Sequence, residues 1–333
     1  MRPVSLIAVI WLGLACTPVP PGPAVPLPPI TLGQRAIRPV AAFGAVWVAI
    51  AADGTVIRVD GATGRIAATV RVADPQRLIA AGCAPSSEHA YATGSFGLRA
   101  CDAPSAVAAG SDAMWATAND TNAIVRIDPT SNMVSATVVL GFDPWAVAAG
   151  DDAVWASDYA NNAVVRVDPR TMTVTARIPV ASGPTEMAVA PGTLWVLNSA
   201  AGMVTRVDTG RSAVVATIAV SDWAVAIAVF GDDVWVRGGS TSGAGGLLRI
   251  DARTNAVAAA YPAGVLLGRE GVGSIVATDR GAWVPGLTLD LIERTTGAVL
   301  TSVPIPSYSV ARDDTSLWIL DVFGRLVRYL ATP

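Results

Sequence analysis

The sequence GDDAVWASDYANNAVVRVDP at residues 150–169 decides the fold, because a near copy, GSDAMWATANDTNAIVRIDP, occupies residues 110–129. Each copy contains a tryptophan, Trp115 or Trp155, and an arginine, Arg126 or Arg166, further along. Short valine-rich segments alternate with turn-forming clusters such as GDD, DYANN and DPRTM. Alternating segments of this kind predict β-strands, and the clusters between them predict turns. One unit with its flanking residues therefore predicts four antiparallel strands.

The same unit recurs along most of the chain. Its tryptophans are Trp47, Trp115, Trp155, Trp195, Trp235, Trp283 and Trp318. A period near 40 residues with four strands per repeat is typical of a β-propeller blade. We therefore predict an all-β fold, a seven-bladed β-propeller of four-stranded antiparallel blades.

Three residue types recur at fixed places in the repeat, and each suggests a structural role. We expect the tryptophans to pack between neighbouring blades, since a buried indole is mainly a packing residue. The repeated arginines and the aspartates that follow them are expected to have a structural role in the strands and turns of each repeat. Those aspartates are Asp60, Asp128, Asp168, Asp208 and Asp251. In the sixth repeat, Glu293 is expected to take the arginine's place.

The two ends of the chain are expected to meet in one blade. After Trp318 only enough residues remain for a third strand, RLVRYL, whereas ITLG near residue 31 resembles the fourth-strand ending VVLG. We predict that residues 30–34 complete the last blade, which closes the ring and removes an exposed sheet edge. Residues 73–103 are either an insertion or a degenerate eighth blade, because RLIAAG within them echoes a first strand.

The N-terminus predicts export and a lipid anchor. Residues 1–16 begin with an arginine and an apolar run of signal-peptide length, too short to span a bilayer. The run ends in GLAC, which resembles the lipobox of bacterial lipoproteins, and this resemblance implies lipidation of Cys16. Residues 17–29 are proline-rich and are expected to form a semi-rigid linker to the propeller at 30–333. Thr17 favours the outer membrane by the same resemblance, and the expected location is the bacterial envelope, at the outer membrane or the periplasmic face.

Composition excludes several chemistries. The net charge is −3, so the footprint of a nucleic-acid-binding surface is missing. All 23 basic residues are arginines, which excludes a Schiff-base lysine and a phosphate-binding lysine loop. The single histidine, His89, is the only residue on which a Ser-His-Asp triad could be built. Cys83 and Cys101 fit an oxidising compartment, where they could form a disulfide.

The Gly-Asp turn, tryptophan strand, Asn-containing loop and arginine strand of GDDAVWASDYANNAVVRVDP resemble the repeats of the YVTN and virginiamycin B lyase-like propellers. The resemblance extends over about residues 36–330. It implies the propeller fold, whereas activity varies across that superfamily. Streptogramin lyases use a catalytic histidine with a glutamate and magnesium. His89 lies outside the regular repeats, so no catalytic residue carries over.

The candidate site residues are expected on one face of the propeller. In a propeller, the loops between strands two and three and the links between blades gather at one end of the channel, and function concentrates on such loops. The candidates in these loops are Asp53, Asn119, Asp120, Asp158, Tyr159, Asn198, Arg237 and Asp321. Those in the blade links are Asp143, Trp145, Glu186, Asp222, Trp223, Arg269, Glu270 and Tyr308.

Two kinds of site follow from these candidates. Ligand contact is expected from Trp145, Tyr159, Trp223, Arg237, Arg269 and Tyr308. A calcium or magnesium ion could be held by Asp158, Glu186, Asp222 and Glu270, since hard cations prefer oxygen ligands. The simpler alternative is that these acidic residues are solvated turn formers.

The sequence favours a binding or protein-interaction module over an enzyme. We expect an exported, lipid-anchored monomer at the cell envelope that binds a small molecule, a peptide or an envelope polymer and no nucleic acid. The alternative is a metal-assisted lyase or hydrolase at the mouth of the channel, with calcium or magnesium as the cofactor.

Overall fold

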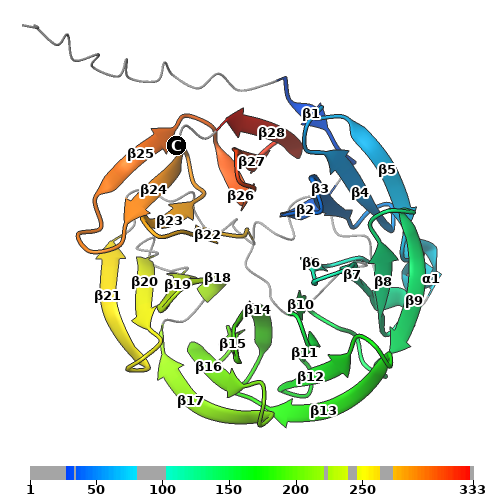
Figure 1. Cartoon of the computed structure of the whole chain (residues 1–333), viewed down its shortest axis with the longest axis horizontal. Coiled ribbons are helices and arrows are strands. Elements are labelled where there is room, and N and C mark those ends of the chain that lie inside the picture. The colour runs from blue at the N-terminus through cyan, green and yellow to red at the C-terminus, as the bar shows by residue number, and fades with distance from the viewer. Residues whose placement is uncertain are drawn as a thin grey trace, which may run out of the picture.

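The computed structural model describes residues 28–33, 35–80, 103–220, 224–238, 246–262 and 273–330. Within these ranges the chain forms seven four-stranded antiparallel sheets arranged as the blades of a β-propeller (Figure 1). The predicted fold is therefore confirmed. The signal peptide, most of the linker, Cys16, Cys83, His89 and Cys101 lie outside the described residues.

The first four blades follow one another in chain order. Blade 1 contains β2 (Ala36–Ala42), β3 (Ala45–Ile50), β4 (Thr55–Asp60) and β5 (Ile66–Arg71). Blade 2 contains β6 (Val107–Ala109), β7 (Met114–Ala118), β8 (Ala123–Asp128) and β9 (Met133–Val139). Blade 3 contains β10 (Val147–Ala149), β11 (Val154–Asp158), β12 (Ala163–Asp168) and β13 (Thr173–Pro179). Blade 4 contains β14 (Pro184–Ala190), β15 (Thr193–Asn198), β16 (Met203–Asp208) and β17 (Ala213–Ala219).

The remaining blades complete the ring. Blade 5 contains β18 (Ala224–Phe230), β19 (Asp233–Gly238), β20 (Gly246–Asp251) and β21 (Ala256–Pro262). Blade 6 contains β22 (Val276–Ala277), β23 (Gly281–Val284), β24 (Leu289–Glu293) and β25 (Val299–Val303). Blade 7 combines β26 (Ser307–Arg312), β27 (Ser316–Asp321) and β28 (Arg325–Leu330) with β1 (Ile30–Thr31) from the other end of the chain.

Pairing of the two ends closes the ring as predicted. Ile30 lies opposite Leu326 and Thr31 lies opposite Arg325, so β1 is the outer strand of blade 7. Leu32 follows directly and is buried with Leu326 and Trp318 in the cluster that joins blade 7 to blade 1. Only β1 comes from before blade 1, and the other three strands come from the end of the chain.

The segment between blades 1 and 2 is not a strand where the sequence suggested one. Residues Pro75–Ala80 form a short helix, α1, where RLIAAG suggested a first strand, and the described residues form seven blades. A 3-10 turn, η1 (Asn119–Thr121), follows β7. The backbone N–H of Asp74 donates to Asp120 in this turn at 3.0 Å, which ties α1 to blade 2.

The repeated tryptophans pack between blades, which confirms the prediction. All except Trp283 are less than 2% exposed. Trp47 of blade 1 lies in one cluster with Met114 of blade 2, and Trp155 of blade 3 lies with Leu194 of blade 4. Each blade therefore places its indole against the next, and these contacts form a continuous apolar core around the ring.

The repeated arginines and aspartates are structural, also as predicted. Trp155 lies opposite Arg166, and the Arg166 guanidinium contacts the Asp152 carboxylate at 3.3 Å. Asp168 accepts hydrogen bonds from the backbone N–H groups of Arg170 and Thr171, which holds the following turn. These hydrogen bonds lower the pKa of Asp168 below its ordinary value.

The sixth repeat departs from the expectation for Glu293. Leu291, not Glu293, lies opposite Trp283. The Glu293 carboxylate accepts hydrogen bonds from the backbone N–H groups of Thr295 and Thr296 at 2.9 and 2.6 Å. Glu293 thus occupies the place of the repeated aspartates. The spacing along the chain did not indicate this, because Glu293 follows its tryptophan by ten residues, three fewer than the thirteen that separate Trp155 from Asp168.

None of the helices that the structure describes has both the length and the apolar composition needed to cross a membrane.

Candidate functional site

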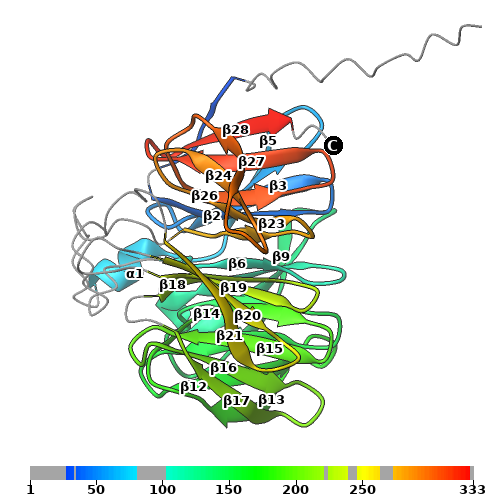
Figure 2. The same ribbon diagram turned by 90° about the vertical axis from the view of Figure 1, so that its left-hand side faces the viewer.

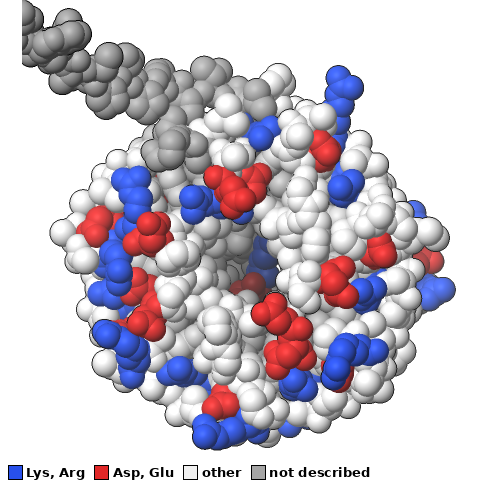
Figure 3. Space-filling model, viewed as in Figure 1, with Lys and Arg blue, Asp and Glu red and all other residues white. Residues whose placement is uncertain are grey.

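The two ends of the propeller differ in what they carry. The loops between second and third strands and the links between blades share one end, which we call the loop face. The hairpins between first and second strands and between third and fourth strands share the other, the turn face. Helix α1 belongs to a blade link and projects from the loop-face side of the disc (Figure 2). Figure 3 looks onto the turn face, where acidic and basic side chains lie close together around the rim and the ring is open at its centre.

Two of the predicted ligand residues, Trp145 and Tyr159, meet on the loop face. Trp145 lies in the link between blades 2 and 3, and Tyr159 follows β11 directly. Their rings stack with centroids 4.9 Å apart and planes 27° apart. Both side chains are only partly buried. The pair therefore offers a flat aromatic surface that the repeat itself does not require.

The surroundings of this pair combine apolar and basic groups. Phe142 and Trp145 both pack against the core between blades 2 and 3. The Arg177 guanidinium lies 5.3 Å from the centre of the Phe142 ring. Gly183, with a φ of +67°, leaves room for Tyr159, because a Cβ there would stand 3.1 Å from the tyrosine Cε2. We call Phe142, Trp145, Tyr159 and Arg177 the aromatic cluster. Sequence reasoning missed Phe142 and Arg177, because their approach depends on the packing of the link against β13.

The predicted metal ligand Asp158 has protein partners. Its side chain is 1% exposed and forms an ion pair with Arg177. It also accepts hydrogen bonds from the backbone N–H of Asn161 at 3.1 Å and from the Asn161 amide at 2.9 and 3.0 Å. These contacts fix the loop between β11 and β12.

The predicted metal ligand Glu186 forms an ion pair with Arg38 across the ring. Glu186 lies at a register shift in the inner strand β14 of blade 4, and Arg38 lies at a register shift in the inner strand β2 of blade 1. Arg38 has a φ of +39°, which an arginine adopts only at a steric cost. Because blades 1 and 4 are separated by two blades on one side and three on the other, this ion pair crosses the central channel (Figure 1).

Only two of the four proposed metal ligands, Asp158 and Glu186, lie within the described residues. Asp158 and Glu186 each face an arginine, and Asp222 and Glu270 lie outside the described residues. In the ranges that the structure covers, no three acidic, histidine or cysteine side chains converge on a point where a cation could bind. Calcium or magnesium binding by this set stays a prediction.

Arg237 is placed differently from the other predicted site residues that the structure describes. It lies near the loop-face end of β19 and is 4% exposed. Its backbone pairs with Ala226 and Leu247, whereas its buried side-chain Nη1 has no hydrogen-bond acceptor among the described residues. Burial lowers the pKa of the guanidinium to about 10. An unpaired buried cation of this kind is costly to the fold.

The remaining ligand candidates fall into two groups. The Tyr308 hydroxyl donates to the backbone carbonyl of Ala36 at 2.8 Å, and its ring packs in the core that joins blades 7 and 1. Tyr308 therefore connects blade 7 to blade 1 at the junction that closes the ring. Trp223 and Arg269 lie outside the described residues.

The other loop-face candidates are held in local hydrogen bonds. The Asn119 amide donates to Asp143 at 2.6 Å and to the Pro144 carbonyl at 2.8 Å, which joins blade 2 to the next link. Asn198 donates to the hydroxyl of Thr205 inside blade 4. Asp321 accepts from the Arg325 guanidinium at 2.7 Å. Asp53 lies just after β3, where its backbone N–H bonds to Ile50.

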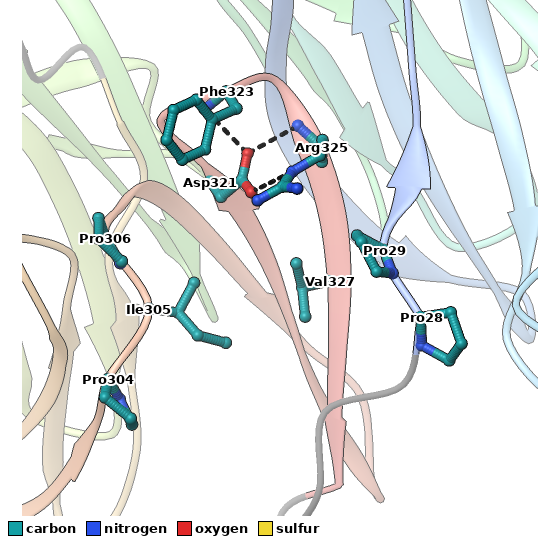
Figure 4. A pocket seen from close by; sticks show the side chains of 9 residues that line it. All are labelled: Pro28, Pro29, Pro304, Ile305, Pro306, Asp321, Phe323, Arg325 and Val327. Carbon is teal, nitrogen blue, oxygen red and sulfur yellow. Dashed lines mark hydrogen bonds and ion pairs between the residues drawn. The ribbon is translucent and has the colours of Figure 1, made fainter.

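A separate pocket of about 420 Å³ lies beside blade 7 (Figure 4). Prolines line it on both sides, and the Asp321–Arg325 pair lies at one end. Phe323 stands at this end with 74% of its surface exposed, and the Arg325 guanidinium lies 5.0 Å from its ring centre. The lining residues are Pro28, Pro29, Pro304, Ile305, Pro306, Asp321, Phe323, Arg325 and Val327. The sequence did not suggest this pocket, because it forms where the N-terminal segment meets the last blade.

Comparisons with known proteins support the fold. No family model matches the chain, and no curated protein matches its sequence. Among solved structures, a catalytically inactive virginiamycin B lyase from Staphylococcus aureus with quinupristin is 11% identical, with a TM-score of 0.66 over 92% of this chain and 99% of that one. The structure of U3-55K is 10% identical, with a TM-score of 0.68 over 91% and 98%.

A third similar structure is hydrazine synthase from Kuenenia stuttgartiensis, which is 18% identical with a TM-score of 0.57 over 66% of this chain and 73% of that one. These three proteins differ in what their names describe, and all are distant in sequence. The likeness therefore shows a shared β-propeller architecture, which includes that of virginiamycin B lyase, and leaves function to the residues of the loop face.

Proposed function

We propose that this protein is an exported, membrane-tethered binding module that takes a ligand on its loop face at the cell envelope. The single observation that carries the binding role is the aromatic cluster. Its stacked Trp145 and Tyr159 are partly exposed, lie outside the packing register of the repeated tryptophans and have an arginine nearby. Aromatic and arginine side chains are the types that dominate binding energy at interfaces.

The neighbouring charges favour binding over metal-assisted chemistry at this cluster. Asp158 is engaged by Arg177 and Asn161, so its carboxylate is not available as a base or a metal ligand in this arrangement. A flat ring pair beside a guanidinium suits the apolar face of a sugar ring or a peptide side chain. We therefore place an envelope polymer or peptide on the cluster.

Co-sedimentation of the full chain with insoluble peptidoglycan tests the binding role. We expect Trp145→Ala to weaken binding about tenfold or more, since losing an aromatic anchor costs about 2 kcal/mol at an interface. Phe230→Ala is the matched control, because Phe230 is also exposed but lies in a hairpin of the turn face. Binding that is equally strong in the wild type and in Trp145→Ala, or lost equally in Phe230→Ala, would contradict the proposed face.

Membrane fractionation tests the tether. The GLAC sequence motivates the expectation that the wild-type protein sediments with membranes and incorporates labelled palmitate. Cys16→Ala should abolish labelling and move the protein out of the membrane fraction. A wild-type protein that is unlabelled would refute the lipid anchor without affecting the binding role.

A further inference from the structure

At three junctions between blades, a serine hydroxyl forms a hydrogen bond to the backbone of the next blade. A buried hydroxyl of one blade donates to a backbone carbonyl of the next. Ser105 donates to the Trp145 carbonyl at 3.1 Å, and Ser199 donates to the Ala224 carbonyl at 2.6 Å. Ser274 donates to the Val310 carbonyl at 2.7 Å. These three hydroxyls therefore have backbone partners in the neighbouring blade, as most buried polar groups do.

Arg237 lies at the loop-face end of the junction between blades 5 and 6. It lies two residues after the repeated tryptophan of its blade, on the same side of the strand. The residues at this place in the seven blades are Ala49, Thr117, Ser157, Leu197, Arg237, Pro285 and Leu320. The other six are small, apolar or hydroxyl-bearing, so blade geometry does not require a charge there.

The surroundings of Arg237 offer it no counter-charge in the described ranges. Its partners across the sheet are Ala226 and Leu247, both apolar. These two pack with Ile275 of blade 6. Asp233, on the same strand, is about 13 Å away along the strand and already binds Arg249 and Arg294. A guanidinium in this setting needs an anion from elsewhere.

We propose that Arg237 anchors a binding site for a monoanionic carboxylate ligand with an apolar body at the loop-face end of the junction between blades 5 and 6. The inference rests on the proposed function, because it assumes that the loop face binds ligands. A guanidinium binds a carboxylate through two parallel hydrogen bonds. A single positive charge balances one carboxylate, whereas a phosphate dianion would need further donors. The apolar neighbours Ala226, Leu247 and Ile275 suit a hydrocarbon body.

Ligand-dependent thermal unfolding of the full chain tests this site, with sodium benzoate as the probe and sodium chloride at the same ionic strength as the reference. We expect benzoate to raise the melting temperature of the wild type, since a ligand that binds only the folded state stabilises it. Benzamide, which has the same ring and no charge, should have no effect. An equal response to benzamide, or a response to inorganic phosphate alone, would overturn the carboxylate class.

Two substitutions locate the binding. Arg237→Met keeps an apolar side chain of similar reach, and we expect its apparent dissociation constant for benzoate to rise about tenfold or more. Its melting temperature without ligand should equal or exceed that of the wild type, because a buried unpaired charge is removed. Arg170→Met is the control, since Arg170 is exposed in a turn. Benzoate binding that survives Arg237→Met, or is lost in Arg170→Met, would overturn the proposal.

The occupant is distinguished by two further variants. If a carboxylate of this chain pairs with Arg237, benzoate will not change the melting temperature of the wild type. It will instead raise the melting temperature of Asp222→Asn or Glu270→Gln. That result would overturn the ligand site, and so would a melting temperature that benzoate changes in neither the wild type nor any variant. Benzoate binding that depends on Arg237 and is unchanged in Trp145→Ala would support it even if the peptidoglycan experiment fails.

Discussion

Local hydrogen bonds in the turns lower the pKa of individual acidic side chains in this protein. Glu293 is the clearest case, because two hydroxyls and two backbone N–H groups of Thr295 and Thr296 donate to one carboxylate oxygen. These bonds favour the charged form and lower the pKa of Glu293 to about 2. The repeated aspartates behave alike, and Asp128, with backbone donors from Thr130 and Ser131, also has a lowered pKa.

A dependence of stability on acid follows from these carboxylates. The pKa of Glu293 is lower in the folded protein than in the unfolded chain, so its contribution is fully present above about pH 5. It is lost as the pH falls from about 4.5 to about 2. We expect urea unfolding at several pH values to show stability falling in this window, with a smaller slope in Glu293→Gln. Part of the slope of stability against pH should remain in Glu293→Gln, because the repeated aspartates also have lowered pKa values. An identical slope in Glu293→Gln would contradict this account.

The carboxylate of Asp158 has contacts in the fold that its position in the sequence did not indicate. Its place on a loop-face strand end suggested a metal ligand, but in the fold it holds Asn161 and Arg177. Arg177 comes from the outer strand β13, on the far side of β12. The pairing depends on the sheet and cannot be seen in the spacing along the chain.

At the scale of the element, each second strand joins two blades through its tryptophan. Trp155 is 1% exposed and packs with Leu194, Val196 and Val207 of the next blade. On the other strand face, neighbouring residues contact the preceding blade, as Val154 and Ala156 do in the cluster with Trp115. Strands of this kind are buried on both faces, which explains why they read as nearly continuous apolar runs.

Truncating one of these tryptophans should weaken the whole propeller. We expect Trp155→Ala to lower the free energy of unfolding by about 3–5 kcal/mol, because the lost contacts leave a cavity between blades. Val174→Ala on the outer strand of the same blade is the control, with an expected change within about 0.5 kcal/mol, since Val174 is 46% exposed. Chemical denaturation measures both. Equal effects of the two substitutions would mean that the tryptophan does not join the blades.

At the scale of the whole molecule, the ring depends on one short strand. β1 contributes two paired residues, and Leu32 adds a buried side chain at the junction of blades 7 and 1. Without β1 the outer edge of β28 would lack its partner, and unpaired edges promote association between chains. Tyr308 and Trp318 make further contacts with blade 1, so closure combines pairing and core packing.

Truncation tests this closure. Removing residues 1–33 deletes β1 and Leu32, and we expect a loss of about 2 kcal/mol or more in the free energy of unfolding, the cost of removing one buried leucine. Size-exclusion chromatography should also show association through the freed edge. Removing only residues 1–27 leaves β1 in place and should change neither quantity. Equal stability of the two truncated proteins would show that β1 does not close the ring.

Much of this architecture could be predicted from local patterns. The alternation of valines, the tryptophan spacing and the turn residues predicted seven blades, and the likeness of ITLG to VVLG predicted the closing strand. Two local expectations were wrong. RLIAAG resembled a first strand, but Pro75–Ala80 is helical and is held by Asp120 of the next blade. Glu293 was assigned by counting along the chain, whereas its register is set by pairing with Gly281.

The candidate site was predictable only in part. Trp145 was expected on the loop face because it lies in a blade link, and Tyr159 because it lies in a loop between second and third strands, yet their stacking depends on how the link folds against β11. Arg237 was expected to contact a ligand. The sequence could not indicate that its cross-strand neighbours are the apolar Ala226 and Leu247, or that its buried Nη1 has no partner among the described residues.

The sequence by itself determined the blades, because strand alternation and turn chemistry act over a few residues and repeat with the period of one blade. The tertiary structure alone decided which side chains meet across the ring. Arg38 reaches Glu186 only because two register shifts turn these side chains into the same channel. Such contacts join positions far apart in the chain, and their geometry exists only once the ring has closed.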